Sequence, residues 1–165
     1  MLKNLFGGLS RNRKSFMLYA HMSGNLIPLR EVEDEVFSSG MLGDGIAIEP
    51  IDNKLFSPCS GTVGHIFDTH HAINIVSDFG CEILLHIGLD TVELKGKGFD
   101  IKVKEGDRIN KGDLLCIFDP DVIKGAGLKT TTPMVITNAS EYTKIEARPK
   151  CPINTGDSVL KIEKE

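Results

Sequence analysis

The chain has 165 residues, 41% of them hydrophobic and 25% charged, and a formal net charge of −4. This length and composition predict one globular domain, and the acidic balance disfavours binding to nucleic acid, which normally requires a basic face. The four cysteines form no CxxC pair, and no apolar stretch is of secretory or membrane-spanning type, so we expect reduced thiols in a cytoplasmic protein.

Residues 1–14 differ in pattern from the rest of the chain, and we treat them as a separate segment. Apolar residues recur there at helical spacing among positive charges, at Leu2, Leu5, Phe6 and Leu9. Such a pattern is also found in amphipathic helices that lie on an anionic membrane surface. Because two adjacent glycines weaken a helix here, we expect a flexible terminus, with weak membrane-surface contact as the alternative. We expect residues 15–165 to form the functional domain.

From residue 15 onward, short apolar runs separated by turn residues predict an all-β fold. Short strands at such spacing are typical of an antiparallel β-sandwich or a barrel-like fold. The expected strands cover residues 16–20, 25–28, 45–49, 54–56, 62–67, 72–76, 82–87, 101–103, 114–118, 134–137, 144–147 and 159–163. At most short helices are expected, one of them over residues 121–126 after Pro120.

A weak internal repeat indicates two similar hairpin units. Residues 104–115 and 156–160 share a Gly-Asp turn followed by an apolar strand, an arrangement known as a hammerhead turn. Biotinyl and lipoyl carrier domains use the same kind of turn, but they carry a modifiable lysine in a Met-Lys-Met or Asp-Lys context. Because this sequence contains neither, a swinging-arm carrier is disfavoured.

His86 is the first candidate for chemistry, because its imidazole stands within an otherwise apolar strand. Alternation along the strand places Ile83, Leu85 and Ile87 on one face, which is the expected core face. His86 then lies with Leu84 on the opposite face, accessible but framed by apolar groups. A neutral imidazole is a nucleophile at neutral pH, and the alternative is an ordinary half-buried histidine.

Two further histidines, His70 and His71, directly precede another expected strand, and the strand pattern alone does not choose between them. A pair of imidazoles on a rigid β-scaffold suits either a phosphoryl group or a metal ion. A zinc hydrolase would need a third ligand such as Glu82 or Asp90, and no HxH or HExxH motif supports one. A binding module without catalysis is the third hypothesis.

Five blocks of sequence, taken in their order and spacing, identify a resemblance to a known family. They are residues 43–47 (GDGIA), 56–64 (FSPCSGTVG), 69–73 (THHAI), 84–94 (LLHIGLDTVEL) and 95–99 (KGKGF). With these blocks the chain, from about Phe16 to its C-terminus, resembles the glucose-family enzyme IIA of the bacterial phosphoenolpyruvate-dependent sugar phosphotransferase system. The resemblance implies an antiparallel β-sandwich that carries a phosphoryl group on a histidine.

By this resemblance, His86 corresponds to the histidine that receives the phosphoryl group on its Nε2 atom. His71, rather than His70, corresponds to the second active-site histidine, which donates a hydrogen bond to the phosphoryl group. The resemblance also implies that the Thr69 hydroxyl orients His71, and that the Gly88 carbonyl accepts from Nδ1–H of His86. The latter hydrogen bond selects the tautomer in which Nε2 is the nucleophile.

The resemblance further implies two macromolecular partners and no required cofactor. Phosphorylated HPr would supply the phosphoryl group, and a cysteine of the IIB domain of a IIB/IIC sugar permease would receive it. No metal is required, although His71 and His86 could bind zinc incidentally. Because selectivity lies mainly in the permease, glucose, N-acetylglucosamine and β-glucosides are equally compatible with this sequence.

Six further residues are expected to form a partner-binding rim around the imidazoles. By resemblance they are Asp34, Val36, Phe37, Phe67, Leu84 and Asp90. Leu84 stands where some members have phenylalanine, and His21 stands where proline is frequent. Neither departure removes a group that phosphoryl transfer requires, and His70 is expected to be a bystander.

Overall fold

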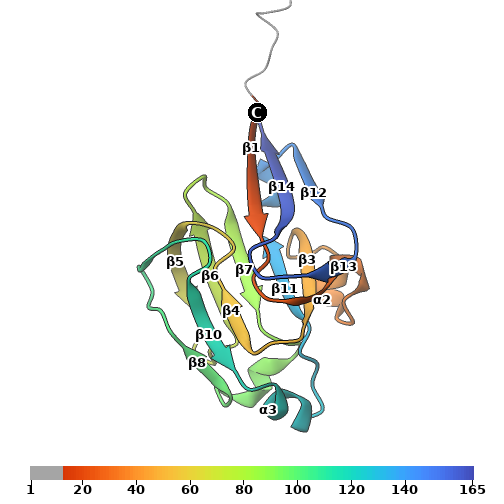
Figure 1. Ribbon diagram of the computed structural model, residues 1–165, viewed down its shortest axis with the longest axis vertical. Coiled ribbons are helices and arrows are strands. Elements are labelled where there is room, and N and C mark those ends of the chain that lie inside the picture. The colour runs from red at the N-terminus through yellow and green to blue at the C-terminus, as the bar shows by residue number, and fades with distance from the viewer. Residues whose placement is uncertain (1–12) are drawn as a thin grey trace, which may run out of the picture.

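The computed structural model describes residues 13–165 as a β-rich domain with short helices (Figure 1). Every strand pair in this part of the chain is antiparallel, which confirms the predicted all-β, antiparallel architecture. The strands are β1 (Lys14–Tyr19), β2 (Gly24–Pro28), β3 (Asp44–Pro50), β4 (Lys54–Phe56), β5 (Gly61–Ile66), β6 (Ala72–Ser77), β7 (Glu82–His86), β8 (Phe99–Ile101), β9 (Arg108–Ile109), β10 (Leu114–Phe118), β11 (Thr132–Ile136), β12 (Lys144–Ala147), β13 (Cys151–Ile153) and β14 (Ser158–Lys164). The helical segments are η1 (Leu29–Glu31), α2 (Glu35–Ser38), η2 (Thr91–Leu94), α3 (Pro120–Gly125) and η3 (Ala139–Glu141).

Most predicted strands overlap the observed ones, and the differences have local causes. β8 begins two residues before the predicted run 101–103, because Phe99 pairs with Phe118 of β10. Two short strands were not predicted from the sequence: β9, which has two residues, and β13, which contains Pro152. Proline lacks a backbone N–H and is normally found on edge strands, where β13 lies.

The two short α-helices begin at aspartate N-caps. The Asp34 carboxylate accepts from the Val36 backbone N–H at 3.0 Å and starts α2, which the sequence analysis did not predict. Asp119 caps α3, whose first residue is Pro120, one residue earlier than predicted. A single-turn helix leaves no periodic apolar pattern in the sequence, which explains why α2 was missed.

The strands form one large sheet and two small sheets around a common core. The large sheet has the order β13-β2-β3-β11-β7-β6-β5-β9, and the small sheets are β1-β14-β12 and β4-β10-β8. In the view of Figure 1, β4, β10 and β8 lie in front of β5 and β6. Leu55 of β4, Leu115 of β10 and Ile75 of β6 belong to the same buried cluster. The packed layers are therefore the predicted sandwich.

Strand β7 shows how the core is divided between the two faces of the large sheet. Ile83 and Leu85 pack into the larger cluster, between the sheets. Leu84 points the other way, into a smaller cluster with Val135, its partner on β11. The alternation agrees with the sequence pattern. However, residues 29–37 cover the second face, so Leu84 is only 8% exposed, and His86, which was expected to be accessible, is half-buried.

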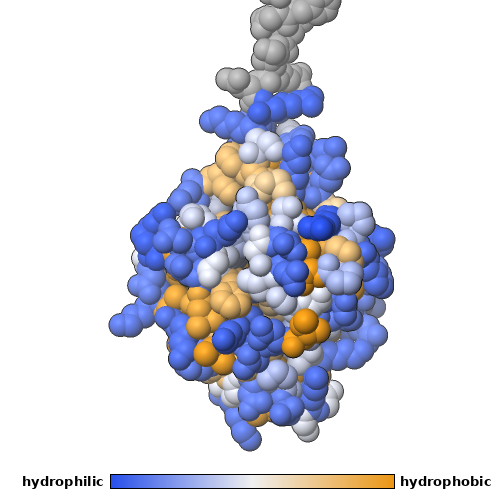
Figure 2. All heavy atoms as spheres, viewed as in Figure 1, coloured by the Kyte–Doolittle hydropathy of each residue, from blue (hydrophilic) through white to orange (hydrophobic). Residues whose placement is uncertain are grey.

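The described surface is mainly polar, with isolated apolar side chains. Figure 2 shows hydrophilic side chains over most of one face, with small apolar patches between them. The exposed large hydrophobic side chains are Val36, Met41, Ile51, Val76 and Val92. Within residues 13–165, no helix has the length and apolar character needed to cross a membrane.

The first fourteen residues, expected to contact a membrane surface or to be flexible, fall almost wholly outside the described residues. Strand β1 begins at Lys14, which pairs with Lys164 of β14. The sheet thus starts one residue before the expected domain boundary. Membrane contact by residues 1–14 stays a prediction.

The four cysteines are free thiols. Cys59, Cys81 and Cys116 are buried in the larger cluster, and Cys151 is half-buried beside it. They pack as small apolar side chains, in line with the usual behaviour of free cysteine in a core.

His21 is a fully buried histidine to which the sequence analysis assigned no function. Its Nε2–H donates to the Thr132 carbonyl at 2.9 Å, whereas Nδ1 has no hydrogen-bond partner. Burial lowers the pKa of His21 to about 4, and the hydrogen bond to Thr132 only partly opposes this shift. The folded protein therefore holds His21 neutral at pH 7.

We expect His21→Gln to make the fold less sensitive to acid. Between pH 6.5 and about pH 4, the unfolded chain protonates His21 and the folded chain does not, so stability falls as the pH falls. At about 1.4 kcal/mol per pH unit, this residue removes about 3 kcal/mol by pH 4. Glutamine keeps an N–H near the place of Nε2 but does not titrate. Urea denaturation at pH 7 and in mild acid measures the difference, and parallel losses in both proteins would contradict the prediction.

Candidate active site

The structure brings His71 and His86 together at one end of strands β6 and β7. His86 is the last residue of β7 and pairs with Ala72, the first residue of β6. The Ile87 N–H donates to the His71 carbonyl at 2.7 Å, which extends the pairing beyond the strand ends. The two imidazole rings meet edge to face, with centroids 4.9 Å apart and planes at 81°.

His70 does not join this pair. Its backbone is left-handed, with a φ of 58°, and its side chain is exposed in the turn before β6. That turn is closed by a hydrogen bond from the His70 N–H to the Phe67 carbonyl at 2.7 Å, and by one from the Phe67 N–H to the Ala72 carbonyl at 3.1 Å. The turn directs His71 inward and leaves His70 outside. The strand pattern in the sequence had not distinguished these two histidines.

A tight turn after β7 fixes the imidazole of His86. Nδ1 of His86 lies 2.7 Å from the Gly88 carbonyl oxygen, so Nδ1 carries the proton and donates it. The lone pair of the neutral ring then lies on Nε2. Gly88 has a left-handed φ of 71°, and a Cβ there would come within 2.6 Å of the Thr91 methyl carbon and 2.8 Å of the Lys129 carbonyl oxygen. Glycine is therefore the residue that fits this turn.

Thr69 orients the second imidazole. Its hydroxyl oxygen lies 2.7 Å from Nδ1 of His71 and can donate its proton to that nitrogen. In this tautomer Nε2 of His71 keeps its own proton and can donate a hydrogen bond. The His71 side chain is only 4% exposed, so burial and the threonine together restrict the ring to one orientation.

Both imidazoles are held in the neutral state at neutral pH. Burial, and secondarily the neighbouring His86, lowers the pKa of His71 to about 4, against an opposing backbone hydrogen bond. Burial also lowers the pKa of His86, although the hydrogen bond to Gly88 and the nearby carboxylates of Asp34 and Asp90 oppose the shift. A neutral His86 keeps its Nε2 lone pair available.

Two phenylalanines of the predicted partner-binding rim contact the imidazoles directly. The Phe37 ring meets His86 at 64°, with centroids 5.0 Å apart, and the Phe67 ring meets His71 at 76°, with centroids 5.6 Å apart. Phe37 is only 3% exposed, so it is a buried wall of the site rather than an exposed contact, whereas its neighbour Val36 is 43% exposed. These rings exclude water from one side of each imidazole.

Asp34 and Asp90 place two carboxylates near the histidine pair. Asp34 caps α2, and Asp90 adopts a left-handed φ of 57° directly before η2. Both act on the pKa of His86, which shows that they lie within electrostatic reach of its ring. Negative charge beside the imidazoles favours a partner with a positively charged face.

Three exposed residues in neighbouring segments of the chain were not singled out from the sequence. Val92 is 50% exposed on η2, and Met41 is 74% exposed just after α2. The His65 ring lies 5.1 Å from the ring of Phe67. Val92 falls within the block 84–94. Met41 and His65 lie outside the matching blocks, and their exposure becomes visible only in three dimensions.

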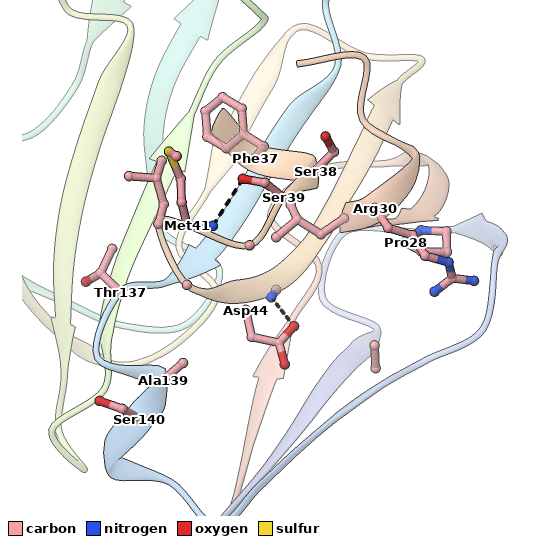
Figure 3. Close-up of a pocket in the computed structure, with 16 residues that line it drawn as sticks. Pro28, Arg30, Phe37, Ser38, Ser39, Met41, Asp44, Thr137, Ala139 and Ser140 are labelled. Atoms are coloured by element: carbon pink, nitrogen blue, oxygen red, sulfur yellow. Dashed lines mark hydrogen bonds between the residues drawn. The ribbon is translucent and has the colours of Figure 1, made fainter. Parts of the chain in front are cut away.

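A cavity of about 600 Å³ lies beside α2 and is lined in part by Phe37 (Figure 3). Figure 3 marks the hydrogen bond from the Met41 N–H to Ser39 Oγ, at 3.3 Å in the loop after α2, and the one from the Gly45 N–H to the Asp44 carboxylate, at 2.8 Å at the start of β3. Neither imidazole lines the cavity. Phe37 is the residue that this cavity shares with the histidine site.

The zinc hydrolase considered from the sequence would need a third ligand beside the two histidines. Among residues 13–165, no three His, Cys, Asp or Glu side chains come together in a way that could hold a metal ion. Glu82 lies at the opposite end of β7 from His86, and the proposed triad is therefore not assembled.

Proteins of similar sequence and structure are known. Residues 16–142 match the family described as phosphoenolpyruvate-dependent sugar phosphotransferase system, EIIA 1. The glucose-specific EIIA component of Halalkalibacterium halodurans is 38% identical over 167 residues, covering 97% of this chain and 96% of the relative. The structure of glucose permease IIA from Mycoplasma capricolum has a TM-score of 0.84 and 39% identity, covering 90% of this chain and 96% of that one.

A further relative is much longer than this chain. The β-glucoside-specific EIIBCA component of Halalkalibacterium halodurans is 49% identical over 140 residues, which cover 85% of this chain and 22% of the relative. The chain thus spans about a fifth of the length of such β-glucoside-specific relatives.

The antiparallel β-sandwich and the two facing imidazoles at the ends of adjacent strands agree with what the sequence blocks implied. This chain belongs to the EIIA 1 family of the phosphoenolpyruvate-dependent sugar phosphotransferase system. The resemblance inferred from the sequence blocks is confirmed.

Gly88→Ala is expected to destabilise the fold by about 1–3 kcal/mol more than Gly106→Ala, because only Gly88 lacks room for a side chain. Both glycines are left-handed, with φ of 71° and 88°, so alanine costs similar backbone strain at each. A Cβ at Gly106 would meet nothing within 4 Å, whereas at Gly88 it would overlap the Lys129 carbonyl. Urea denaturation of the two variants measures the difference. Equal losses would show that the turn after β7 can accommodate a side chain.

Proposed function

We propose that this protein is a phosphohistidine carrier in which Nε2 of His86 accepts a phosphoryl group from phosphorylated HPr and passes it to a cysteine of the IIB domain of a sugar permease. The observation that carries the proposal is a pair of neutral imidazoles whose Nδ1 atoms are both hydrogen-bonded. This arrangement leaves one Nε2 as a nucleophile and the other as a donor. Membership of the EIIA 1 family supports the same reaction.

In the first transfer, the lone pair of His86 Nε2 attacks phosphorus, and the P–N bond to the imidazole of the donor breaks. The electron pair of that bond returns to the donor ring. The proton on Nδ1 of His86 stays in place, so positive charge develops on the phosphorylated ring. The Gly88 carbonyl accepts from that proton and stabilises the charge. The stabilising hydrogen bond already exists before the reaction, so no reorganisation is needed.

During the transfer, His71 donates its Nε2–H to a phosphoryl oxygen. The edge-to-face contact of the rings, with centroids 4.9 Å apart, keeps this donor next to His86. Because its pKa is lowered to about 4, His71 donates as a neutral ring. A neutral donor holds the phosphoryl group less strongly than a charged one would. This suits a carrier that must release the group again.

In the second transfer, the thiolate of the partner cysteine attacks the phosphorus atom. A P–S bond forms, the P–N bond to His86 breaks, and its electron pair restores the Nε2 lone pair. The proton on Nδ1 is not exchanged in either step. The carrier therefore returns to its starting tautomer after every cycle, ready for the next phosphoryl donor.

Both partners would dock on the same face of the domain. The partner-binding rim offers an exposed apolar contact at Val36 and carboxylates at Asp34 and Asp90. Phe67 and Leu84 complete the apolar frame around the imidazoles. A partner with an apolar centre and surrounding positive charges is complementary to this surface. One shared docking face requires HPr and the IIB domain to bind in turn.

Longer relatives support a permease partner, because their names join EIIA to B and C components. We therefore propose a IIB/IIC permease in the membrane and residues 15–165 as the IIA domain that serves it from the cytoplasm. Similar proteins are named as glucose-specific and β-glucoside-specific, so these are the sugars to test first.

We propose that the transfer needs no metal or other cofactor. The steps above use imidazole, hydroxyl and carbonyl groups of the chain itself. A zinc ion bound incidentally between His71 and His86 would occupy the Nε2 lone pair of the nucleophile. Zinc would therefore inhibit the transfer rather than assist it.

The first test is phosphorylation by phosphoenolpyruvate with enzyme I and HPr, followed by intact-mass measurement and site mapping. The wild-type protein should gain one acid-labile phosphoryl group, on His86, only when HPr is present. His86→Ala should gain none, because the nucleophile is lost. A folded wild-type protein that gains no phosphoryl group from active HPr, or gains it on another residue, would refute the proposal.

His71→Ala should slow phosphoryl transfer about 10²–10³-fold in both directions, because the donor to the phosphoryl oxygen is lost. His71→Gln retains an N–H near the place of Nε2 and should lose less. Phosphorylation should still map to His86, whose lone pair is unaffected. Rapid-quench rates from phospho-HPr to the protein and back provide the measurement. Wild-type rates in the alanine variant would remove His71 from the mechanism.

A further inference from the structure

Thr91 is a buried residue of the turn after β7 that takes no part in the mechanism described above. It is the first residue of η2, and its side chain has no exposed surface. Its hydroxyl donates to the Ile87 carbonyl at 2.5 Å. This carbonyl belongs to the peptide unit that directly precedes Gly88. Thr91 therefore acts on the same turn whose next carbonyl orients His86.

Hydrogen bonds hold both peptide units that flank Gly88. The Thr91 hydroxyl donates to the carbonyl of the Ile87–Gly88 unit, and the Gly88 N–H of the same unit donates to the Thr132 hydroxyl at 3.4 Å, a much longer bond. The Leu89 N–H donates to the Lys129 carbonyl at 2.9 Å and holds the Gly88–Leu89 unit. The Gly88 carbonyl is the opposite end of that second unit. Its direction is thus set by bonds on both sides of the α-carbon.

The methyl group of Thr91 restricts Gly88 as well. A Cβ at Gly88 would lie 2.6 Å from the Thr91 methyl carbon, so this methyl packs directly against the glycine α-carbon. The hydroxyl and the methyl of one side chain therefore fix the peptide before Gly88 and the space beside it. β-Branching makes such a side chain stiff, which suits this task.

We propose that Thr91 is a positioning residue for phosphoryl transfer: it holds Gly88 so that the glycine carbonyl meets Nδ1–H of His86. The inference deepens the proposed function and rests on it. Thr91 does not touch the reacting atoms, and it acts through Gly88. Without its hydroxyl, only the long bond from the Gly88 N–H to Thr132 restrains the Ile87–Gly88 peptide, which can then rotate so that the Gly88 carbonyl moves away from Nδ1. Part of the His86 population then carries its proton on Nε2, where no lone pair is left for attack.

Three variants separate the hydroxyl, the methyl and general destabilisation. Thr91→Val keeps the shape of the side chain but removes the hydroxyl. Thr91→Ser keeps the hydroxyl but removes the methyl. Ser57→Ala is the matched control, because Ser57 is 2% exposed and donates to the Cys59 carbonyl at 2.7 Å, away from the histidines. Ser57→Ala removes a buried hydrogen bond from a hydroxyl to a carbonyl, of the same kind as the bond that Thr91→Val removes.

The decisive measurement is ring-nitrogen NMR of the unphosphorylated protein, which shows which nitrogen of His86 is protonated. Wild type and Ser57→Ala should show Nδ1–H, Thr91→Val a mixture of tautomers, and Thr91→Ser a smaller admixture. Transfer from phospho-HPr should fall about 10- to 100-fold in Thr91→Val, the loss typical when a group that orients a functional histidine is removed. Thermal unfolding confirms that each variant is folded at the temperature used.

Each outcome decides the proposal. Thr91→Val with the wild-type tautomer and rate overturns it, and so does a loss of the same size in Ser57→Ala. If Thr91→Val does not fold, Thr91→Ala, which also lacks the hydroxyl, takes its place, and a wild-type tautomer and rate in that variant overturn the positioning role. The NMR comparison needs no phosphoryl donor. Failure of the wild type to accept a phosphoryl group would therefore refute the proposed function separately from the role of Thr91.

Discussion

The hydrogen bond from Nδ1–H of His86 to the Gly88 carbonyl is the constraint on which the site depends. A histidine at a strand end can rotate about two side-chain bonds and can exchange its proton between two nitrogens. This single bond removes both kinds of freedom. The entropy of orienting the nucleophile is lost when the protein folds and not when the partner arrives. The left-handed conformation of Gly88 and the close packing around it hold the carbonyl in place. The lowered pKa of His86 keeps the ring neutral in this position.

The large sheet makes this geometry stable because β7 is buried on both faces. Leu85 faces the larger cluster, and Leu84 faces the smaller one beneath residues 29–37. A slip of one residue in the pairing of β7 would exchange these faces and carry His86 into the larger core. The smaller cluster also brings Phe37 against the His86 ring. The packing that fixes the strand register therefore builds one wall of the site.

Local patterns in the sequence predicted much of this arrangement, and contacts between distant segments account for the rest. Alternation along β7 placed His86 and Leu84 on one face, and the blocks shared with a known family implied the pairing of His86 with Gly88. The one-turn helix α2 has no period to detect, so the burial of Phe37 against His86 was not predicted. Residue pattern alone also did not separate His71 from His70, because a turn rather than strand alternation directs them. No pattern predicted that His21 is buried with its Nε2–H bonded to the Thr132 carbonyl, because this contact joins residues far apart in the chain.

The burial of the thiols has a consequence for the direction of phosphoryl flow. The chain contains cysteines of its own, and a thiol is the kind of acceptor to which His86 is proposed to deliver. Burial raises the pKa values of Cys59, Cys81 and Cys116 to about 12 each, so these side chains stay protonated and unreactive. Internal transfer to these three thiols would waste the phosphoryl group. In the proposed transfer, the burial of these three thiols would leave the thiolate of the partner as the acceptor.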